Sequence, residues 1–180
     1  MRMRAPRHHC ARLLGSIALV CLSAGLFVVA TATPVAAFPR CETTPDAHIV
    51  VSSEAHRLWL CAGYREVKSY WVRLARNGTG KRQAGDAMLP LGSYVLGAPR
   101  ESKKFGLFIP IGYPSPQQAA QGYTGDSVGI HGPHRAVRWL GYLVNAFDTT
   151  AGCVGVATDG DMREIAGFAS QQRARWITIR

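Results

Sequence analysis

Short apolar runs separated by turn residues fill the chain from residue 47 to its C-terminus. Runs rich in Val, Ile, Phe, Tyr and Trp and bounded by Gly, Pro or Asn predict β-strands. Runs of this kind lie at 47–52, 57–61, 68–75, 91–96, 105–111, 127–131, 154–157 and 173–179. Many short strands with few helices are typical of a mainly β sandwich or barrel, and this is the fold class that we predict.

Two further segments have helical spacing. Apolar residues between 136 and 147 recur at intervals of three and one, which predicts a helix or helical turn whose apolar face packs in the core. These residues are Ala136, Trp139, Leu140, Leu143, Val144 and Phe147. Asp161 is a candidate N-cap for a helix that runs to about residue 171, with Glu164 completing a capping box. The Pro-, Gln- and Gly-rich stretch 113–126 predicts a mobile loop rather than a regular element. For the whole domain we therefore expect one or two short helices.

The first 37 residues have the layout of a secretory signal peptide. A basic head with four arginines and no acidic residue precedes an apolar run at 13–30, and small residues precede a cleavage point after Ala37. The run is borderline in length for a retained membrane anchor, which is the alternative. We expect one exported domain, residues 38–180, in the periplasm or cell wall, with no stable membrane anchor after cleavage.

The charge of this domain is basic. Without the arginines of the signal, 17 Lys and Arg stand against 11 Asp and Glu, a net charge of +6. An exported basic domain suits an anionic surface or an acidic substrate, such as a cell-wall polymer or a peptide carboxylate. The arginine–aromatic patterning of nucleic-acid binders is missing, so we expect no nucleic-acid partner. The sequence predicts no particular oligomeric state.

Three cysteines follow the signal peptide: Cys41, Cys61 and Cys153. An odd number in an oxidising compartment indicates one disulfide and one free thiol. Cys41 and Cys61 are close in sequence at the start of the domain, so we pair them, which leaves Cys153 free. Free cysteine is often a small buried core residue, but the residues around Cys153 indicate chemistry instead.

A histidine and this cysteine stand in specific surroundings. Ile130-His131-Gly132 ends a predicted strand, and Thr150-Ala151-Gly152-Cys153 follows, with the cysteine 22 positions after the histidine. A histidine can accept a thiol proton or pair with a preformed thiolate, and the thiolate can attack a carbonyl. We therefore expect Cys153 to be a nucleophile and His131 its partner.

These segments resemble the L,D-transpeptidase catalytic domain (YkuD type) of bacterial cell-wall enzymes. That family joins Ile-His-Gly to a downstream Ser/Thr-x-Gly-Cys, and one variant carries Asp-Trp-Thr-x-Gly-Cys-Ile-Ala-Val, to which residues 148–156 are similar. Its upstream Gly-Asp and Thr-Pro-x-Gly-x-Tyr are matched in order by Gly85-Asp86 and by residues 89–94, with Leu89 in place of the threonine. The resemblance covers roughly residues 48–171.

The resemblance implies a thiol mechanism on peptidoglycan without a cofactor. Cys153 would attack a tetrapeptide stem at the bond between diaminopimelate and the terminal D-Ala. The resulting thioester would pass to an amine on another stem, to a protein or to water. The family also implies that a backbone carbonyl after the histidine, here that of Gly132, orients the ring. Backbone N–H groups around Cys153 are candidate oxyanion donors, and Gly152 would let the substrate approach closely.

Three neighbouring residues have open roles. Thr150 either hydrogen-bonds within the site or simply ends a strand. Arg135 and Arg138 follow the histidine and are candidates for binding stem carboxylates, the alternative being ordinary surface charge.

The chain departs from the commoner family pattern at two points. Ala151 stands where many members have His, and Gly155 with Val156 stands where many have Arg. These changes leave the acceptor open and keep an L,D-carboxypeptidase or other hydrolase of the same class of bond as an alternative. The basic charge alone would also suit an inactive cell-wall-binding protein, and the presence of both His131 and Cys153 weighs against that alternative.

Other chemistries fit the sequence less well. A metal site of His131, His134 and Cys153 is disfavoured because zinc sites show clearer ligand pairs, and Pro133 indicates a turn, so we expect no metal. Papain-like peptidases place Cys before His. Sortases have a much longer His-to-Cys separation, and their Leu-x-Thr-Cys motif is missing here, although Arg163 is available as a downstream arginine.

Overall fold

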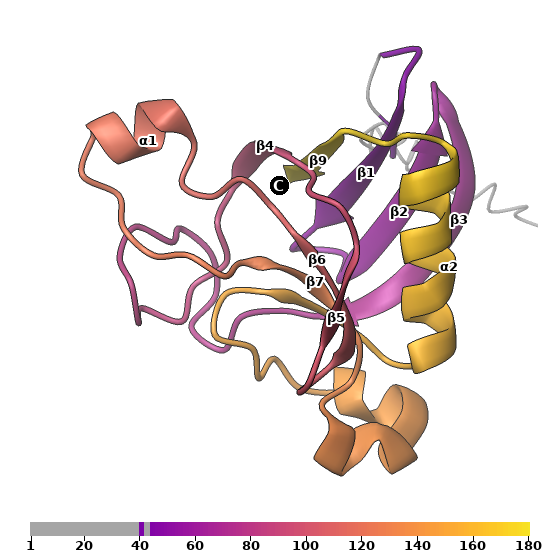
Figure 1. The fold of residues 1–180 in the computed structure, drawn as a ribbon. Coiled ribbons are helices and arrows are strands. Elements are labelled where there is room, and N and C mark those ends of the chain that lie inside the picture. Colours follow the sequence, from indigo (N-terminus) through magenta and orange to yellow (C-terminus); the bar gives the residue numbers. More distant parts are fainter. Residues whose placement is uncertain (1–39, 42–43) are drawn as a thin grey trace, which may run out of the picture. The chain divides into compact units, whose positions relative to one another are not determined.

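The computed structural model describes residues 40–41 and 44–180, so the predicted signal peptide lies outside the described residues. The fold is one nine-stranded sheet in the order β4-β9-β1-β2-β3-β8-β7-β6-β5 (Figure 1). The strands are β1 (Ala47–Ser52), β2 (Arg57–Ala62), β3 (Arg65–Arg73), β4 (Gly92–Val95), β5 (Arg100–Ser102), β6 (Gly106–Pro110), β7 (Gly129–His131), β8 (Val154–Val156) and β9 (Trp176–Ile179). The mainly β prediction is confirmed, and only the short strand β5 was not predicted.

The sheet curls until strands from its two ends meet. Leu96, just after β4, forms a bridge with Ile111, just after β6. Gly97 donates to the Pro110 carbonyl at 2.8 Å, and Gly112 donates to the Val95 carbonyl at 2.8 Å. Backbone groups of β4 that would otherwise form an open edge are therefore paired.

The first strands are buried on both faces. Ile49 and Val51 of β1 belong to the main core inside the curled sheet, whereas Val50 points to the other face with Trp59. A disulfide covers that second face and joins Cys41 to Cys61 with a Cα–Cα distance of 5.7 Å. Burial on both sides explains why this strand is a continuous apolar run rather than an alternating one.

Helix α2 (Asp159–Gln171) packs its apolar face into the main core through Met162, Ile165, Ala166 and Ala169. Figure 1 shows the helix beside the sheet, and its Glu164 accepts from the Tyr70 hydroxyl of β3 at 2.8 Å. The prediction of Asp161 as the N-cap was wrong. Thr158 is the cap, and its hydroxyl accepts from the Asp161 backbone N–H at 3.0 Å. Threonine in an extended conformation supplies the same oxygen acceptor, so the helix begins one turn earlier.

The helical segment predicted at 136–147 is present, but the prediction that its apolar face packs in the core was wrong. Residues Arg135–Asn145 form a 3₁₀ segment, η1, that is broken at Gly141, where φ is 53° and ψ is −131°. Trp139 is 78% exposed, Leu143 71% and Phe147 76%, and Asn145 is the buried residue of the segment. The kink prevents one continuous apolar stripe, and no element of the described chain covers these side chains.

The predicted mobile loop at 113–126 contains a short helix, α1 (Pro116–Ala120). The Ser115 hydroxyl accepts from the Gln118 backbone N–H, and the Gln118 side chain accepts from the Ser115 backbone N–H, so the two form a capping box with Pro116 in the first turn. The sequence signal was present but was outweighed by the prolines and glycines nearby. Within residues 40–41 and 44–180, no helix is long and apolar enough to cross a membrane.

Candidate active site

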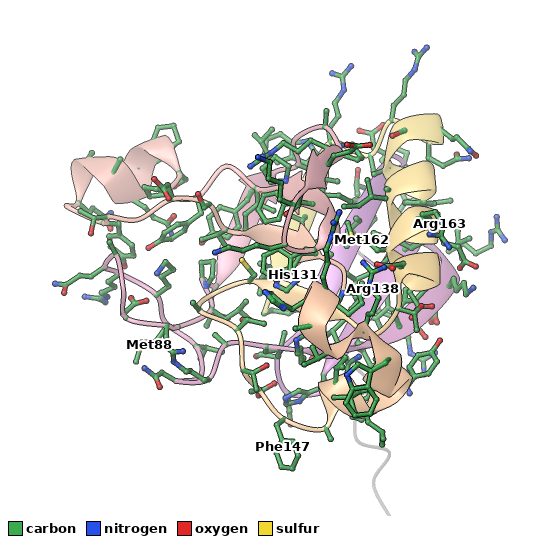
Figure 2. The ribbon with its side chains drawn as sticks, turned by 60° about the horizontal axis from the view of Figure 1, so that its bottom comes forward. Met88, His131, Arg138, Phe147, Met162 and Arg163 are labelled. Carbon is green, nitrogen blue, oxygen red and sulfur yellow. A yellow bond between two sulfur atoms is a disulfide. The ribbon has the colours of Figure 1, made fainter. Side chains whose placement is uncertain are left out.

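His131 is the last residue of β7, a strand held between β6 and β8. It pairs with Phe108 of the antiparallel neighbour and with Gly155 of the parallel neighbour. Its side chain is 3% exposed. Figure 2 shows His131 toward the middle of the molecule, whereas Phe147 points outward. The sheet therefore fixes the backbone of the histidine on both sides.

Two contacts fix the imidazole ring itself. Nδ1 lies 2.7 Å from the Gly132 carbonyl oxygen, and the ring stacks on Phe105 with a centroid distance of 4.0 Å and an interplanar angle of 25°. A carbonyl oxygen can only accept, so Nδ1 carries the hydrogen and Nε2 of the neutral ring carries the lone pair. A Cβ at Gly132 would lie 2.6 Å from the Phe105 carbonyl oxygen, so only glycine fits there.

Cys153 lies directly before β8. The parallel pairing of Ile130 with Val154 places Cys153 beside Gly129 on β7. Cys153 is a half-buried free thiol, and its Sγ donates to the Ser127 carbonyl at 3.5 Å. His131 and Cys153 line the same cavity of about 930 Å³. The fold thus brings together the two residues that the sequence nominated.

Burial keeps both groups uncharged. It lowers the pKa of His131 to about 4, assisted by the nearby charges of Arg73 and His134 and opposed by the hydrogen bond to Gly132. Burial also raises the pKa of the Cys153 thiol, opposed by the Gly129 backbone N–H and the positive charge of Lys81. Near neutral pH the resting pair is therefore a neutral imidazole and a protonated thiol, rather than an imidazolium with a preformed thiolate.

The turn before the nucleophile is tightly tied. The Thr150 hydroxyl donates to the Cys153 carbonyl at 2.7 Å, and the Thr150 backbone N–H donates to Leu74 at 3.0 Å. Gly152 has a φ of +128°, and a Cβ there would lie 2.9 Å from the Met88 carbonyl oxygen. Glycine is needed at this position because φ is positive and the Met88 carbonyl oxygen occupies the place of a side chain, and close approach of the substrate to Gly152 stays a prediction.

A buried ion pair lies behind this turn. Lys81 is 5% exposed, its Nζ lies 2.7 Å from Asp86, and its side-chain carbons reach the surroundings of Gly152. Asp86 also accepts from the backbone N–H groups of Arg82, Gln83 and Met88. Burial opposes ionisation of Asp86, but Lys81 and these N–H groups hold its pKa well below the ordinary value. The Gly85-Asp86 motif therefore acts structurally, by fixing the loop that faces Gly152.

Asp148 anchors the other end of the turn. One carboxylate oxygen accepts from the Leu74 backbone N–H at 2.7 Å, and the other lies 2.9 Å from Nε2 of His56. Arg76 donates its backbone N–H to the Thr150 carbonyl at 3.1 Å, which continues the same attachment. The segment that leads to Cys153 is thus hydrogen-bonded to the segment that follows β3.

The structure places the two candidate arginines away from this cavity. Arg138 forms an ion pair with Asp159 at 3.5 Å. Arg135 is exposed and lines a separate cavity of about 610 Å³ with Lys103 and Arg163. Their proposed contact with substrate carboxylates stays a prediction.

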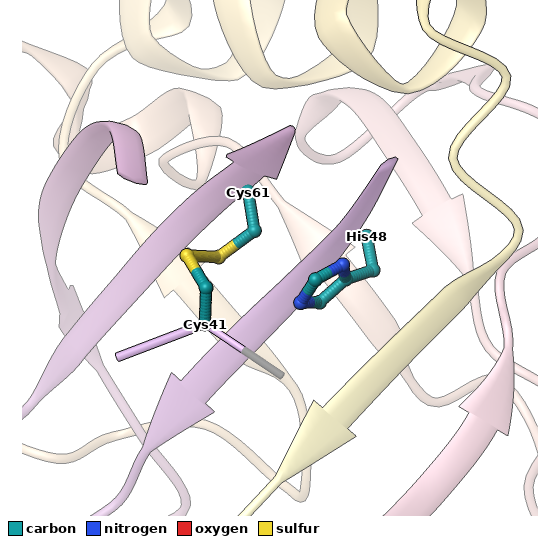
Figure 3. A group of neighbouring side chains, drawn as sticks. All are labelled: Cys41, His48 and Cys61. Carbon is teal, nitrogen blue, oxygen red and sulfur yellow. A yellow bond between two sulfur atoms is a disulfide. The ribbon is translucent and has the colours of Figure 1, made fainter. Parts of the chain in front are cut away.

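One group of potential metal ligands exists among residues 40–41 and 44–180, and it lies away from His131. Figure 3 shows its members, Cys41, His48 and Cys61. The two sulfurs are bonded to each other at 2.07 Å, which leaves no thiolate for a metal. His48 instead uses Nδ1 in a contact of 2.8 Å with the Asp46 carbonyl.

Sequence reasoning missed several residues that shape the site. Phe105 stacks on the histidine, Lys81 lies behind the nucleophile turn, and Arg73, 4% exposed, lines the cavity. Arg73 and Phe105 sit in or beside predicted strands with no local motif. Lys81 lies in a polar, glycine-rich stretch, where a lysine is normally solvated.

Comparison with known proteins gives one family. Residues 46–177 match the family model of the L,D-transpeptidase catalytic domain (YkuD). No curated protein sequence matches the chain.

Solved structures share the fold at low sequence identity. The helical cell shape determining protein Pgp2 from Campylobacter jejuni aligns with a TM-score of 0.62 and 20% identity, covering 75% of this chain and 47% of Pgp2. Bd1075 from Bdellovibrio bacteriovorus aligns with a TM-score of 0.55 and 18% identity, covering 79% of this chain and 50% of Bd1075. The chain therefore spans about half the length of these structures.

Proposed function

We propose, because this chain belongs to the L,D-transpeptidase catalytic-domain family, that it is a cysteine-dependent L,D-transpeptidase of the bacterial cell wall. The donor is the tetrapeptide stem of peptidoglycan, and the bond that breaks joins diaminopimelate to the terminal D-Ala. One observation carries the proposal. A single cavity holds a free thiol, Cys153, and a histidine, His131, whose Nε2 carries the lone pair.

The first half-reaction makes a thioester. The Cys153 thiol gives its proton to Nε2 of His131 while the sulfur bonds to the carbonyl carbon of diaminopimelate. The oxyanion collapses, the C–N bond breaks, and the imidazolium returns the proton to the nitrogen of the leaving D-Ala. A neutral pair at rest suits this step. Burial disfavours the imidazolium, which then forms only during the reaction.

The oxyanion is stabilised by backbone N–H groups of the nucleophile turn. That of Cys153 lies nearest along the chain to the reacting sulfur, so it is the donor that we propose, whereas the N–H of Gly152 already points at the Thr150 hydroxyl oxygen at 3.4 Å. The hydrogen bond from Thr150 to the Cys153 carbonyl holds the turn, which supports a positioning role for Thr150. Such donors are effective only when their direction is set before the charge develops.

The second half-reaction releases the acyl group. An amine of another stem, or of a protein, attacks the thioester carbonyl and loses its proton to His131, and the departing sulfur takes that proton back. Water in place of the amine gives an L,D-carboxypeptidase. The apolar side chains that line the cavity, among them Leu140 and Val144, support transfer, because they limit the water near the thioester.

The same proposal sets the location. Residues 1–37 are a signal peptide, and the catalytic domain acts outside the cytoplasm on the cell wall. The binding partner is the peptidoglycan stem peptide, and nucleic acid is not a partner. The proposal includes an effect of this activity on cell shape, which is the property for which Pgp2 is named.

The test is mass spectrometry of muropeptides after incubation with the purified protein. We expect loss of D-Ala together with a new cross-link, and no change with Cys153→Ala. Loss of D-Ala without a cross-link would assign the carboxypeptidase reaction. A carbapenem, which mimics the acyl donor, should add its mass to the wild-type protein but not to Cys153→Ala. A protein that neither alters muropeptides nor accepts the carbapenem would be an inactive wall-binding protein.

A further inference from the structure

A buried arginine without a counter-charge lies in the wall of the proposed active-site cavity. Arg73, the last residue of β3, is 4% exposed and lines the same cavity as His131 and Cys153. Among residues 40–41 and 44–180, no carboxylate pairs with its guanidinium. A buried charge is costly unless an opposite charge neutralises it. Arg73 is thus a cation that an incoming anion would stabilise.

Most of the donor capacity of this guanidinium is unused. Its hydrogen bonds run from Nη1 to the Asn145 side-chain oxygen and to the Val156 carbonyl, and both are 3.5 Å long. That distance is at the weak limit for a hydrogen bond. In the described part of the chain, no fully buried side-chain nitrogen is left without a partner. The other nitrogens of Arg73 therefore keep solvent contact, and the cavity is where Arg73 meets solvent.

Close packing fixes the guanidinium against β8, the strand that begins directly after the nucleophile. Arg73 pairs across strands with Gly155, and a Cβ at Gly155 would lie 2.8 Å from both Cγ and Nε of the arginine. Because β8 begins directly after Cys153, Gly155 is only two residues beyond the nucleophile. Asn145 donates to the Trp71 carbonyl at 2.6 Å, which holds its own oxygen against the guanidinium. The glycine makes room for the arginine on the strand that carries the nucleophile.

The rest of the cavity favours an anion as well. Its lining contains no Asp or Glu, and Arg73 is its one Lys or Arg. Apolar side chains of residues 137–147 form much of the remaining surface, so the charge acts in surroundings of low polarity. A guanidinium is a planar fork of N–H donors whose geometry matches a carboxylate.

We propose that Arg73 binds a carboxylate of the substrate next to the scissile bond and thereby sets the carbonyl in front of Cys153. The identity of that carboxylate rests on the proposed function. The stem tetrapeptide offers two near the bond: the terminal carboxylate of D-Ala and the free side-chain carboxylate of diaminopimelate.

The first experiment needs no peptidoglycan. Iodoacetate and iodoacetamide both alkylate a thiol with loss of iodide, but only iodoacetate carries a carboxylate. The ratio of their rates at Cys153, followed by peptide mass spectrometry, should fall about tenfold in Arg73→Gln and be partly retained in Arg73→Lys. Arg76→Gln is the matched control, because Arg76 is exposed and outside the cavity lining. An unchanged ratio in Arg73→Gln would overturn the inference.

A measurement on the wild-type protein covers the case in which Arg73→Gln does not fold. D-alanine should protect Cys153 from iodoacetamide, and D-alaninamide, which lacks the carboxylate, should protect it much less. Equal protection by the two compounds would contradict a carboxylate site.

Amidated substrates distinguish the two carboxylates. Tetrapeptides with either the terminal or the diaminopimelate carboxylate converted to an amide are compared with the parent peptide. The amidation that removes the Arg73 ligand should lower kcat/KM by about a hundredfold in the wild type and have little effect in Arg73→Gln. If the wild type turns over none of the peptides, the proposed function fails while the alkylation result stands. If the wild type turns over all three equally, Arg73 has no role in binding.

Discussion

The two walls of the cavity around Cys153 are built in opposite ways. The sheet wall consists of Arg73, His131 and Thr150, which are 4%, 3% and 7% exposed and are all hydrogen-bonded. The outer wall, residues 135–147, presents Leu143 and Phe147 at 71% and 76% exposure. Every group with a chemical role in our proposals lies on the sheet wall or on the turn bonded to it. The outer wall contributes apolar surface.

The difference shows where a precise arrangement is required. On the sheet wall each polar side chain is held by strand pairing and by at least one further contact, so its direction is set before substrate arrives. The outer wall is a 3₁₀ segment with a kink at Gly141, and its buried link to the sheet is Asn145. Short 3₁₀ segments have poorer hydrogen-bond geometry than α-helices. We therefore expect substitutions on the sheet wall to lower stability and the Cys153 acylation rate more than substitutions on the outer wall.

The largest effect that we expect is a loss of folding stability in acid, and its source is His131 on the sheet wall. His131 has a folded pKa of about 4 and an ordinary unfolded value of about 6.5, so the folded protein binds fewer protons between these pH values. Its contribution to stability is complete above about pH 6.5 and is lost as pH falls toward 4. The difference corresponds to about 3 kcal/mol in the free energy of unfolding. Urea unfolding at pH 7.5 and at pH 4 measures it.

His131→Asn should lose less stability than the wild type over this interval. Trp139→Ser is the control on the outer wall, because Trp139 is exposed, carries no titratable group and does not line the cavity. That variant should follow the wild-type pH dependence. If His131→Asn keeps the full acid slope, the buried neutral histidine is not its source.

Two glycines, one on each side of the cavity, provide the second prediction. In Gly132→Ala the new Cβ would lie 2.6 Å from the Phe105 backbone oxygen, so the ring stack and the Nδ1 hydrogen bond of His131 must shift. We expect a loss of about 1–3 kcal/mol in unfolding free energy and a clear fall in the rate of Cys153 acylation. Thermal unfolding and acylation by a carbapenem are the measurements.

Gly141→Ala is the matched change on the outer wall. A Cβ there meets nothing within 4 Å, although φ is +53°, so the cost is backbone strain alone in an exposed segment. The strain can be relieved by a local shift, and the Cys153 acylation rate should stay near that of the wild type. Equal losses of rate in the two alanine variants would remove the distinction between the walls.

The third prediction concerns the link between the walls. Asn145→Ala removes the side-chain donor of the 2.6 Å hydrogen bond to the Trp71 carbonyl and one acceptor of Arg73. Loss of a hydrogen bond of this kind costs about 1 kcal/mol. Hydrogen exchange should increase at residues 135–147 and remain unchanged in β7. Exchange that increases equally in both regions would mean that the outer wall is part of the same cooperative unit as the sheet.

The positions of most strands were predictable because local residues decide them. The 47–52 run is apolar throughout, and the structure buries both of its faces. The 136–147 pattern predicted a helical segment correctly, but the predicted burial of its apolar face was wrong for a physical reason. Spacing indicates which side chains share a face, but it does not indicate whether another element covers that face. Trp139 and Phe147 share a pattern with core residues and nevertheless lie at the surface.

The site was predictable only where it has local motifs. His131 and Cys153 each stand in a short string of characteristic neighbours, and the fold brings both to one cavity. Arg73 has no such string. Its significance depends on pairing with Gly155, a residue on a strand distant in sequence, and on the absence of a carboxylate near it in the described chain. Cross-strand pairing of this kind is set by tertiary structure, so one sequence does not display it.

The smallest expected effect is on the outer wall. Trp139 is 78% exposed and does not line the cavity, and its indole N–H donates to the Ala136 carbonyl at 3.1 Å. Trp139→Ser should change the free energy of unfolding by no more than about 0.5 kcal/mol, because exposed side chains contribute little. The Cys153 acylation rate should also stay unchanged. A loss comparable with that of Gly132→Ala would show that the outer wall supports the sheet wall, and the comparison between them would then fail.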